Sequence, residues 1–393
     1  MNYILFDDNS RNTLLPLTFM RPVADIRIGI LTIREKWEYH LKSKTSTLTE
    51  SYLSEKYPII RGEKNILING SVVPSPELVE KVLSLKPKET LVGEDYIIAM
   101  RLSADEFDRL DEINATQEIN TDINHFKLNF PWEIFQYNGE SIIMDFIRLT
   151  QNRTSEDISP TNNILGHENI FIEKGARVEF ATLNATDGPI YIGKNAEIME
   201  NTVIRGPFAM CENSTVKVGA KIYGPTTIGP SSKVAGEISN SVIFGYSNKA
   251  HDGFLGNSVI AEWCNLGSDT NTSNLKNTYE PVRVWSYAQQ SFVDTGLTFC
   301  GLIMGDHSKC GINTMFNTGS VVGINSNIFG SGYQRVFISS FKWGGPSGFN
   351  RYDLEKAINV ARIVYGRRGL DFDNVSENLF RSVFDMTAGT SNY

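Results

Sequence analysis

The chain has 393 residues, of which 41% are hydrophobic, and a formal net charge of -8. No run of Lys or Arg is dense enough to follow a phosphate backbone, so we expect neither nucleic acid nor an anionic membrane as a partner. The first residues, MNYILFDD, lack the basic and apolar regions of a signal peptide, and no apolar run approaches the ~18 residues of a membrane span. We therefore expect a cytoplasmic protein, with about two or three domains at this length.

Residues 1–155 alternate strand-like and helix-like segments. The stretches YILF and NILINGSVV are strand candidates, while RIGILTIREKWEYHL has apolar residues at helical spacing. SPELVEKVLSL places Ser before Pro at a helix start, and SADEFDRL begins with a capping-box pattern. PWEIFQYN and GESIIMDFIRLTQNR follow as further helical stretches. The alternation predicts an α/β domain with a doubly wound sheet.

A hexapeptide repeat dominates the middle of the chain. Small residues follow each aliphatic position by four, and the pattern resumes from Met304 to Ile328. The aliphatic positions are Ile192, Ile198, Ile204, Met210, Val216, Ile222, Ile228 and Val234. A period of six fits neither a helix nor a lone strand, but it fits a solenoid with three short strands per coil. We expect a parallel β-helix over residues 160–342, with small residues at its corners.

The sixfold pattern is lost between about Asn240 and Leu302. We interpret this break as inserted loops at about 240–300, which on a solenoid project from a corner and can wall a groove. The break holds His251, in SNKAHDGFLG, and Asn265, Asn274 and Lys276. Such polar groups have no packing role on an apolar solenoid, so this segment is the candidate site.

SNKAHDGFLG and CNLGSDTNTSNLKNTY resemble the acetyltransferase half of a bifunctional family, glucosamine-1-phosphate acetyltransferase joined to N-acetylglucosamine-1-phosphate uridyltransferase, with its Bacteroidetes-type variant among the relatives. The resemblance implies a left-handed β-helix, acetyl-CoA as acyl donor and an amino-sugar phosphate as acceptor. It also implies a homotrimer, with the acyl site between adjacent prisms.

The same resemblance implies roles for individual residues. His251 matches the general base, Asn265 and Asn274 match asparagines that contact the amino sugar and the acyl donor, and Glu237 falls near a glutamate that faces the sugar. An imidazole can accept a proton from an amine near neutral pH. No serine or cysteine nucleophile motif is present, which favours direct acyl transfer.

Two departures from the family affect the sugar phosphate. Phe254 stands where the family has a tyrosine, and Ser239 falls near a family lysine that binds the phosphate. Lys249 or Lys276 is the candidate substitute.

LLPLTFMRP resembles the signature of sugar-1-phosphate nucleotidyltransferases. The resemblance implies nucleotide binding, with UTP and Mg²⁺ if the domain is active, and the candidate contacts are Arg11, Thr18, Arg21 and Arg27. The preceding segment lacks the family's glycines, and Ser71 stands where the family has a metal-binding aspartate. The metal ligand is therefore unknown, with Asp7, Asp8 and Asp145 as candidates.

Residues 343–393 contain two helix candidates that would cap the last coil. YGRRG is an alternative contact for an anionic ligand such as the phosphates of coenzyme A.

Three functions stay open at this point. The first is a two-site enzyme that acetylates glucosamine-1-phosphate and couples the product to UTP. The second keeps one activity, with either the solenoid or the N-terminal domain inactive. The third is a nucleotide-sugar-binding scaffold without catalysis.

Overall fold

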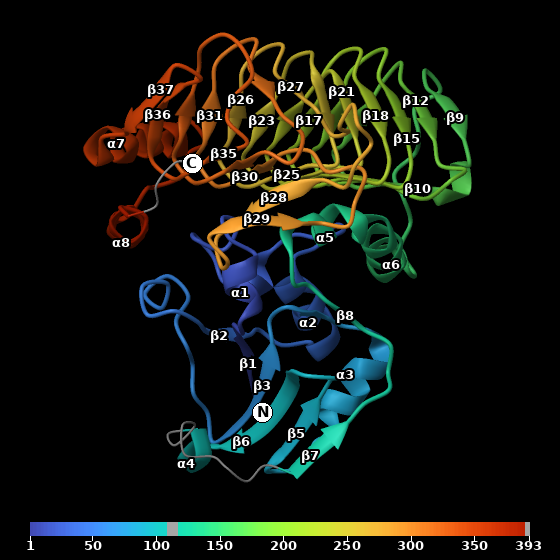
Figure 1. Cartoon of the computed structure of the whole chain (residues 1–393). Coiled ribbons are helices and arrows are strands. Elements are labelled where there is room, and N and C mark those ends of the chain that lie inside the picture. The colour runs from blue at the N-terminus through green and yellow to red at the C-terminus, as the bar shows by residue number, and fades with distance from the viewer. Residues whose placement is uncertain (108–116, 390–393) are drawn as a thin grey trace. The chain divides into compact units, whose positions relative to one another are not determined.

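The computed structural model describes residues 1–107 and 117–389. Their contacts define two compact units, whose elements are labelled in Figure 1. The N-terminal unit comprises Met1–Leu14, Met20–Ile26 and Leu31–Phe130, and the solenoid unit comprises Leu15–Phe19, Arg27–Ile30 and Pro131–Tyr393. The two helical stretches after residue 130 thus pack with the solenoid, whereas the sequence assigns them to the N-terminal domain. The domain boundaries near 155 and 343 stay predictions.

The N-terminal unit is built on a six-stranded sheet with the order β2-β1-β3-β6-β5-β7. Its strands are β1 (Asn2–Phe6), β2 (Ser46–Leu48), β3 (Lys64–Asn69), β5 (Glu89–Val92), β6 (Ile97–Ser103) and β7 (Gln117–Asn120), and β4 (Val72–Val73) pairs with β8 (Phe126–Lys127). Its helices are α1 (Ser10–Thr13), η1 (Val23–Asp25), α2 (Ile33–Leu41), α3 (Pro76–Leu83) and α4 (Ala104–Phe107). The last residues of SADEFDRL lie outside the described residues. The domain is α/β as predicted, and its sheet is mixed, because β6 runs antiparallel to both β3 and β5.

Local capping decides where two of these helices begin. Thr32 accepts a hydrogen bond from the backbone N–H of Glu35, whose side chain bonds back to Thr32, so α2 begins at Ile33. The predicted helix therefore loses residues 27–32. Ser75 caps α3 by accepting a hydrogen bond from the backbone N–H of Leu78, and Pro76 takes the first helical position, as the sequence predicts.

The solenoid unit is a left-handed parallel β-helix of about ten turns, and its coils run from β9 to β37 in Figure 1. Its first face contains β10 (Ile170–Ile172), β13 (Ile190–Ile192), β16 (Phe208–Met210), β19 (Thr226–Ile228), β22 (Val242–Ile243), β25 (Val259–Ile260), β30 (Ile303–Met304), β33 (Val321–Val322) and β35 (Phe337–Ile338). Its second face contains β11 (Arg177–Val178), β14 (Glu197–Ile198), β17 (Thr215–Val216), β20 (Lys233–Val234), β23 (Asn248–Lys249), β26 (Asn265–Leu266), β31 (Lys309–Cys310), β34 (Asn327–Ile328), β36 (Lys342–Gly345) and β37 (Gly348–Arg351). Its third face contains β9 (Asn163–Leu165), β12 (Thr182–Asn184), β15 (Val203–Arg205), β18 (Lys221–Tyr223), β21 (Glu237–Ser239) and β24 (Phe254–Gly256), followed by the pair β27 (Asn271–Thr272) and β32 (Met315–Phe316).

The repeat residues build the core as predicted. The aliphatic positions of the hexads are buried in one continuous cluster along the axis. Corner residues such as Asn195 and Asn213 have positive φ angles of 54° and 57°, a conformation that asparagine tolerates better than most residues. The sixfold spacing therefore reports the coil geometry correctly.

The interruption is much shorter than the sequence predicts. Strands pair through residues 242–272, and the long insertion begins only after Thr272. In a regular coil Ile204 pairs with Ile222, three hexads further along the chain. The coil from Thr227 to its partner Val242 is shorter than three hexads, and so is the next coil, from Val242 to Val259. The hexad spacing is lost because these coils are short, and the expected loops over 240–272 are therefore wrong.

The true insertion lies between β27 and β30. Ile260 pairs with Met304 across this insertion, and the extra chain forms a hairpin of β28 (Arg283–Ser286) and β29 (Ser291–Asp294). Trp285 of this hairpin stacks on Phe337 of the first face, with ring centroids 4.4 Å apart. The insertion is thus anchored on the prism.

Helices complete the solenoid unit. They are η3 (His167–Asn169), α5 (Pro131–Gln136), α6 (Asn138–Thr150), α7 (Leu354–Gly366) and α8 (Asn374–Met386). The C-terminal helices pack on corner aromatics of the solenoid: Tyr365 stacks on Trp263 at 4.0 Å between ring centroids, and Phe380 meets His307 edge-on at 4.7 Å. In the described part of the chain, no helix has the length and apolar character that crossing a membrane requires.

Candidate functional site

His251 lies at a solenoid corner beside a shortened neighbour. The chain turns from β23 to β24 through residues 250–253, and the side chain of His251 is exposed. In the preceding coil, only Ala235 and Gly236 separate β20 from β21, whereas residues 217–220 form the corresponding corner one coil earlier. The short corner removes chain next to His251, which explains why the rhythm of the repeat fails at this point.

Two glycines allow the coils to stack at this corner. Gly236 has a φ of 77°, and a Cβ there would lie 2.7 Å from the carbonyl oxygen of Gly253. Gly253 has a φ of 114°, and a Cβ there would lie 2.2 Å from the carbonyl oxygen of Thr270. Any larger residue would push the coils apart. The position of the histidine corner therefore depends on backbone-to-backbone contact on both sides.

The third face brings several predicted sugar contacts together. Glu237 of β21 is the cross-strand neighbour of Phe254 of β24. Asn274 donates a hydrogen bond to the side-chain oxygen of Asn257 at 2.8 Å, and its amide nitrogen would lie 2.7 Å from a Cβ at Gly256. Phe254 follows the His251 corner directly and is the neighbour of Glu237, whereas Asn274 lies at the other end of β24, beside Gly256 and Asn257.

Asn265 lies on a different face. It belongs to β26 of the second face, where it lines a cavity of about 480 Å³ next to Ala250. Four cations line this cavity, and none of its described lining residues is acidic: Lys233, Lys309, Arg367 and Arg368. Its aromatic wall includes Trp263, stacked on Tyr246 with ring centroids 4.3 Å apart. We call this the second-face pocket. A single chain therefore does not bring Asn265 and Asn274 to one face.

Two of the cations in the second-face pocket, Lys309 and Arg368, differ in their surroundings. Burial lowers the pKa of Lys309 to about 8, and its ammonium donates to the carbonyl oxygen of His307 at 2.8 Å. The guanidinium of Arg368 reaches the side-chain oxygen of Asn248 at 3.4 Å. An anion entering the pocket would stabilise the charged form of Lys309.

The two lysines predicted as substitute phosphate contacts are otherwise engaged. Lys249 is only 3% exposed and points into the prism, where it donates to the carbonyl oxygen of His251 at 2.6 Å. Lys276 lies in the insertion and donates to the carbonyl oxygen of Pro281 at 2.8 Å. The sequence pattern missed Lys221, an exposed lysine that lies opposite Glu237 on the neighbouring strand of the third face. Lys221 was overlooked because it lies outside the segment in which the sixfold pattern is lost.

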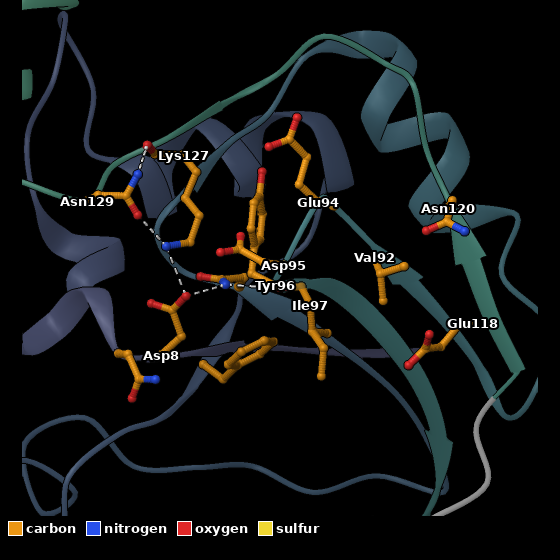
Figure 2. A pocket seen from close by; sticks show the side chains of 14 residues that line it. Asp8, Val92, Glu94, Asp95, Tyr96, Ile97, Glu118, Asn120, Lys127 and Asn129 are labelled. Carbon is orange, nitrogen blue, oxygen red and sulfur yellow. Dashed lines mark hydrogen bonds and ion pairs between the residues drawn. The ribbon is translucent and has the colours of Figure 1, made fainter.

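The N-terminal unit has a cavity of about 930 Å³ (Figure 2). It lies where β1 and β3 end, and several described carboxylates and one lysine line it: Asp8, Glu94, Asp95, Glu118 and Lys127. Figure 2 shows Lys127 between Asp8 and Asn129. Its ammonium lies 3.2 Å from the carboxylate of Asp8 and 2.6 Å from the side-chain oxygen of Asn129.

Asp8 is the centre of this cluster. Burial favours a higher pKa, but hydrogen bonds from Ser10 and Asn69 and the charge of Lys127 outweigh it and lower the pKa of Asp8. Asn69 donates to Asp8 at 2.9 Å and accepts from the hydroxyl of Ser71 at 2.6 Å. Asp8 is therefore an ionised carboxylate at neutral pH. Ser71, at the expected metal position, is buried behind Asn69.

None of the four predicted nucleotide contacts lines this cavity. Arg11 is 6% exposed and bonds to Tyr52 and pairs with Asp7 at 3.7 Å. Thr18 and Arg21 are buried, and Arg27 bonds to the carbonyl oxygen of Ile30. The sequence instead missed Lys127, Asn69 and Asn129, because the signature segment drew attention to residues 11–27.

The residues described here do not form a ready metal site. Among them, no group of three or more His, Cys, Asp or Glu side chains could share a metal ion. Asp8 already accepts hydrogen bonds from Ser10 and Asn69 and forms an ion pair with Lys127. Asp145 is fully buried and accepts hydrogen bonds from Arg148 and from the backbone N–H of Ile30. The donor set thus does not fit a resident Mg²⁺.

Fold and sites together define the class. This is a nucleotidyltransferase-like α/β domain joined to a left-handed parallel β-helix. Residues 3–154 match the family model described as sugar nucleotidyl transferase. The chain carries that domain and is homologous, at modest identity, to bifunctional nucleotidyltransferase/acetyltransferase proteins.

Three relatives illustrate this homology. The uncharacterized acetyltransferase YaiX of Escherichia coli O6:K15:H31 is 28% identical over 148 residues, which cover 37% of this chain and 64% of the relative. The bifunctional protein GlmU of Methanocaldococcus jannaschii is 33% identical over 120 residues, 30% of this chain and 26% of the relative. The bifunctional sugar-1-phosphate nucleotidylyltransferase/acetyltransferase of Sulfurisphaera tokodaii is 28% identical over 248 residues, 56% of this chain and 59% of the relative. The matches thus span less than two thirds of each relative's length.

Proposed function

We propose that the solenoid unit transfers an acetyl group from acetyl-CoA to the amine of glucosamine-1-phosphate, with His251 as general base. The observation that carries this proposal is the placement of His251. It is an exposed imidazole at a corner between Glu237 and Phe254 of the third face and the cationic second-face pocket, which Ala250 lines. The relatives named as acetyltransferases support the same chemistry.

The proposed step is a direct transfer. The substrate amine reacts in its neutral form: its nitrogen forms a bond to the thioester carbonyl carbon while His251 takes one of its protons, and the tetrahedral oxyanion collapses with loss of the thiolate. The imidazolium then returns its proton to the thiolate sulfur. Backbone N–H groups at a coil corner suit the oxyanion, and no covalent enzyme intermediate is needed.

The charges suggest where the two phosphates of the reaction bind. Lys221, beside Glu237, is placed to contact the sugar phosphate on the third face. The second-face pocket, with Arg367 and Arg368, suits the phosphates of the acyl donor. Because Asn265 and Asn274 lie on different faces, we propose that a homotrimer completes the acyl site between adjacent prisms.

The N-terminal unit is proposed to couple the product to UTP. Its cavity and its match to the sugar nucleotidyl transferase model support this activity. Lys127 would contact the triphosphate or the sugar phosphate, and Asp8 would hold Lys127 in place. The alternative is that this unit binds a nucleotide sugar without turnover, since no metal cluster is preformed among the described residues.

Two assays test the proposal. Free thiol released from acetyl-CoA should depend on glucosamine-1-phosphate, and His251→Gln should lower kcat by about a hundredfold or more, whereas His167→Gln, at an exposed site of the first coils, should not. Full activity of His251→Gln would exclude it as the base. Pyrophosphate release from UTP and N-acetylglucosamine-1-phosphate, with and without Mg²⁺, tests the N-terminal unit separately.

A further inference from the structure

One lysine points into the core of the solenoid. Along the second face, the inward residues pair as Val216 with Val234 and Val234 with Lys249, and further along Leu266 pairs with Cys310. The neighbours of Lys249 are apolar and fully or almost fully buried, and Lys249 itself is 3% exposed. A short aliphatic residue would continue this column.

A buried ammonium is costly to the fold unless strong partners compensate for its lost hydration. Within the described chain, Lys249 has no carboxylate at ion-pair distance, and its ammonium donates to a carbonyl oxygen. Burial lowers the pKa of Lys249 to about 8, although Asp252 and Asp269 favour the charged form. Lys249 therefore weakens the column in which it stands, and stability alone does not account for it.

The acceptor of this lysine is the residue at the centre of the site. The ammonium donates to the carbonyl oxygen of His251 at 2.6 Å, which draws that carbonyl toward the prism axis while the histidine side chain is exposed at the corner. The next carbonyl, of Asp252, accepts from the backbone N–H of Asp269 at 3.1 Å. Lys249 thus adds a hydrogen bond from inside the prism to the corner at residues 250–253, which is otherwise held by contacts with the neighbouring coils.

We propose that Lys249 is a positioning residue for His251, fixing the corner backbone from inside the solenoid so that the imidazole is held in its working orientation. This inference rests on the proposed role of His251 as base. It differs from a phosphate contact, because the ammonium is turned away from solvent. The proposal predicts that Lys249 lowers the stability of the fold and raises kcat.

The test is Lys249→Met, which keeps the length of the side chain and removes its charge. We expect a melting temperature equal to or above that of the wild type, a kcat at least tenfold lower, and KM values for both substrates within twofold. Leu266→Met, at the same inward column one coil on, is the matched control and should change kcat by less than twofold. A structural defect alone would lower the melting temperature and would not separate kcat from KM.

Hydrogen exchange gives a second readout that does not need activity. Amides of the peptide covering residues 250–256 should exchange at least fivefold faster in Lys249→Met than in Leu266→Met. Unchanged kcat with unchanged exchange would overturn the inference while leaving His251 as base. If the wild type shows no acyl transfer, or His251→Gln keeps full activity, the proposed function fails, and the exchange comparison still decides whether Lys249 holds the corner.

Discussion

Gly236 and Gly253 stack backbone against backbone at the histidine corner, so closely that a Cβ on Gly236 would lie 2.7 Å from the carbonyl oxygen of Gly253. The contact joins the shortened coil to the coil that carries His251. The neighbouring corner consists of only Ala235 and Gly236. Less of the chain therefore lies beside the imidazole of His251 than beside a residue at a regular corner.

Gly236→Ala should therefore damage both stability and acyl transfer. Gly219→Ala is the matched control, since Gly219 is a corner residue with a φ of 71° and open space around its Cβ position. The control should lose about 1 kcal/mol from the positive φ angle alone, and Gly236→Ala should lose about 2 kcal/mol more from the clash. Denaturation and thiol-release assays measure the two effects. Equal losses in the two variants would show that the corner has room to relax.

Lys221→Met should weaken binding of the sugar phosphate. Lys221 is exposed and lies opposite Glu237 on the neighbouring strand, so removal of its ammonium should raise KM for glucosamine-1-phosphate about tenfold and leave kcat within threefold. Lys194→Met, an exposed lysine on an early coil, serves as the control. A lowered kcat with unchanged KM would argue against a phosphate contact.

Arg367→Ala combined with Arg368→Ala should act on the acyl donor instead. Both residues line the second-face pocket, and losing two cations should raise KM for acetyl-CoA at least tenfold, more strongly at low salt. KM for glucosamine-1-phosphate should not change. Arg335→Ala, exposed outside this pocket, should leave both values unchanged. An equal effect of the double variant on both substrates would place the donor elsewhere.

Lys127→Met should affect the N-terminal unit alone. Lys127 lies 3.2 Å from Asp8 in the 930 Å³ cavity, and its loss should lower pyrophosphate release from UTP about a hundredfold while acyl transfer continues. It should also raise the pKa of Asp8, because the lysine charge helps to lower that pKa. Lys86→Met, in an exposed loop of the same unit, is the control. A uridylyl-transfer rate unaffected by Lys127→Met would remove this lysine from the proposed mechanism.

Lys249 should make stability depend on pH in a defined window. Its pKa falls on folding from about 10.5 to about 8, so between these values the unfolded state binds more protons and the folded state gains stability as pH rises. Below pH 8 the wild type should be less stable than Lys249→Met by as much as about 3 kcal/mol, from about 1.4 kcal/mol per pKa unit. The gap should narrow from pH 8 to pH 10.5. Urea denaturation of both proteins at several pH values measures it, and a gap independent of pH would contradict the burial of a charged lysine.

Sequence patterns predicted the architecture well where one local rule applied. The start of α3 after Ser75 follows from capping chemistry, and the aliphatic hexads from Ile192 to Val234 are buried as predicted. The pattern failed where coil length changed. Residues 242–272 continue all three faces, but coils shorter than three hexads shift the spacing, so that this segment looks like a loop.

The candidate sites were predicted less completely. The sequence pointed to His251, Asn265 and Asn274 through their common segment, yet Asn265 and Asn274 lie on different faces of the chain. It directed attention to Arg11 and Arg21, which are buried, and passed over Lys127. Proximity along the chain was a poor guide to proximity in space.

By itself, the sequence determined the coil period and the small residues at the corners, because each depends on residues a few positions apart, and its resemblance to known families indicated the class of protein. Only the tertiary structure decided that Lys249 points inward to the carbonyl of His251 and that Lys127 meets Asp8. Those contacts depend on how long each coil is and which strands are neighbours. The spacing of residues along the chain does not record either.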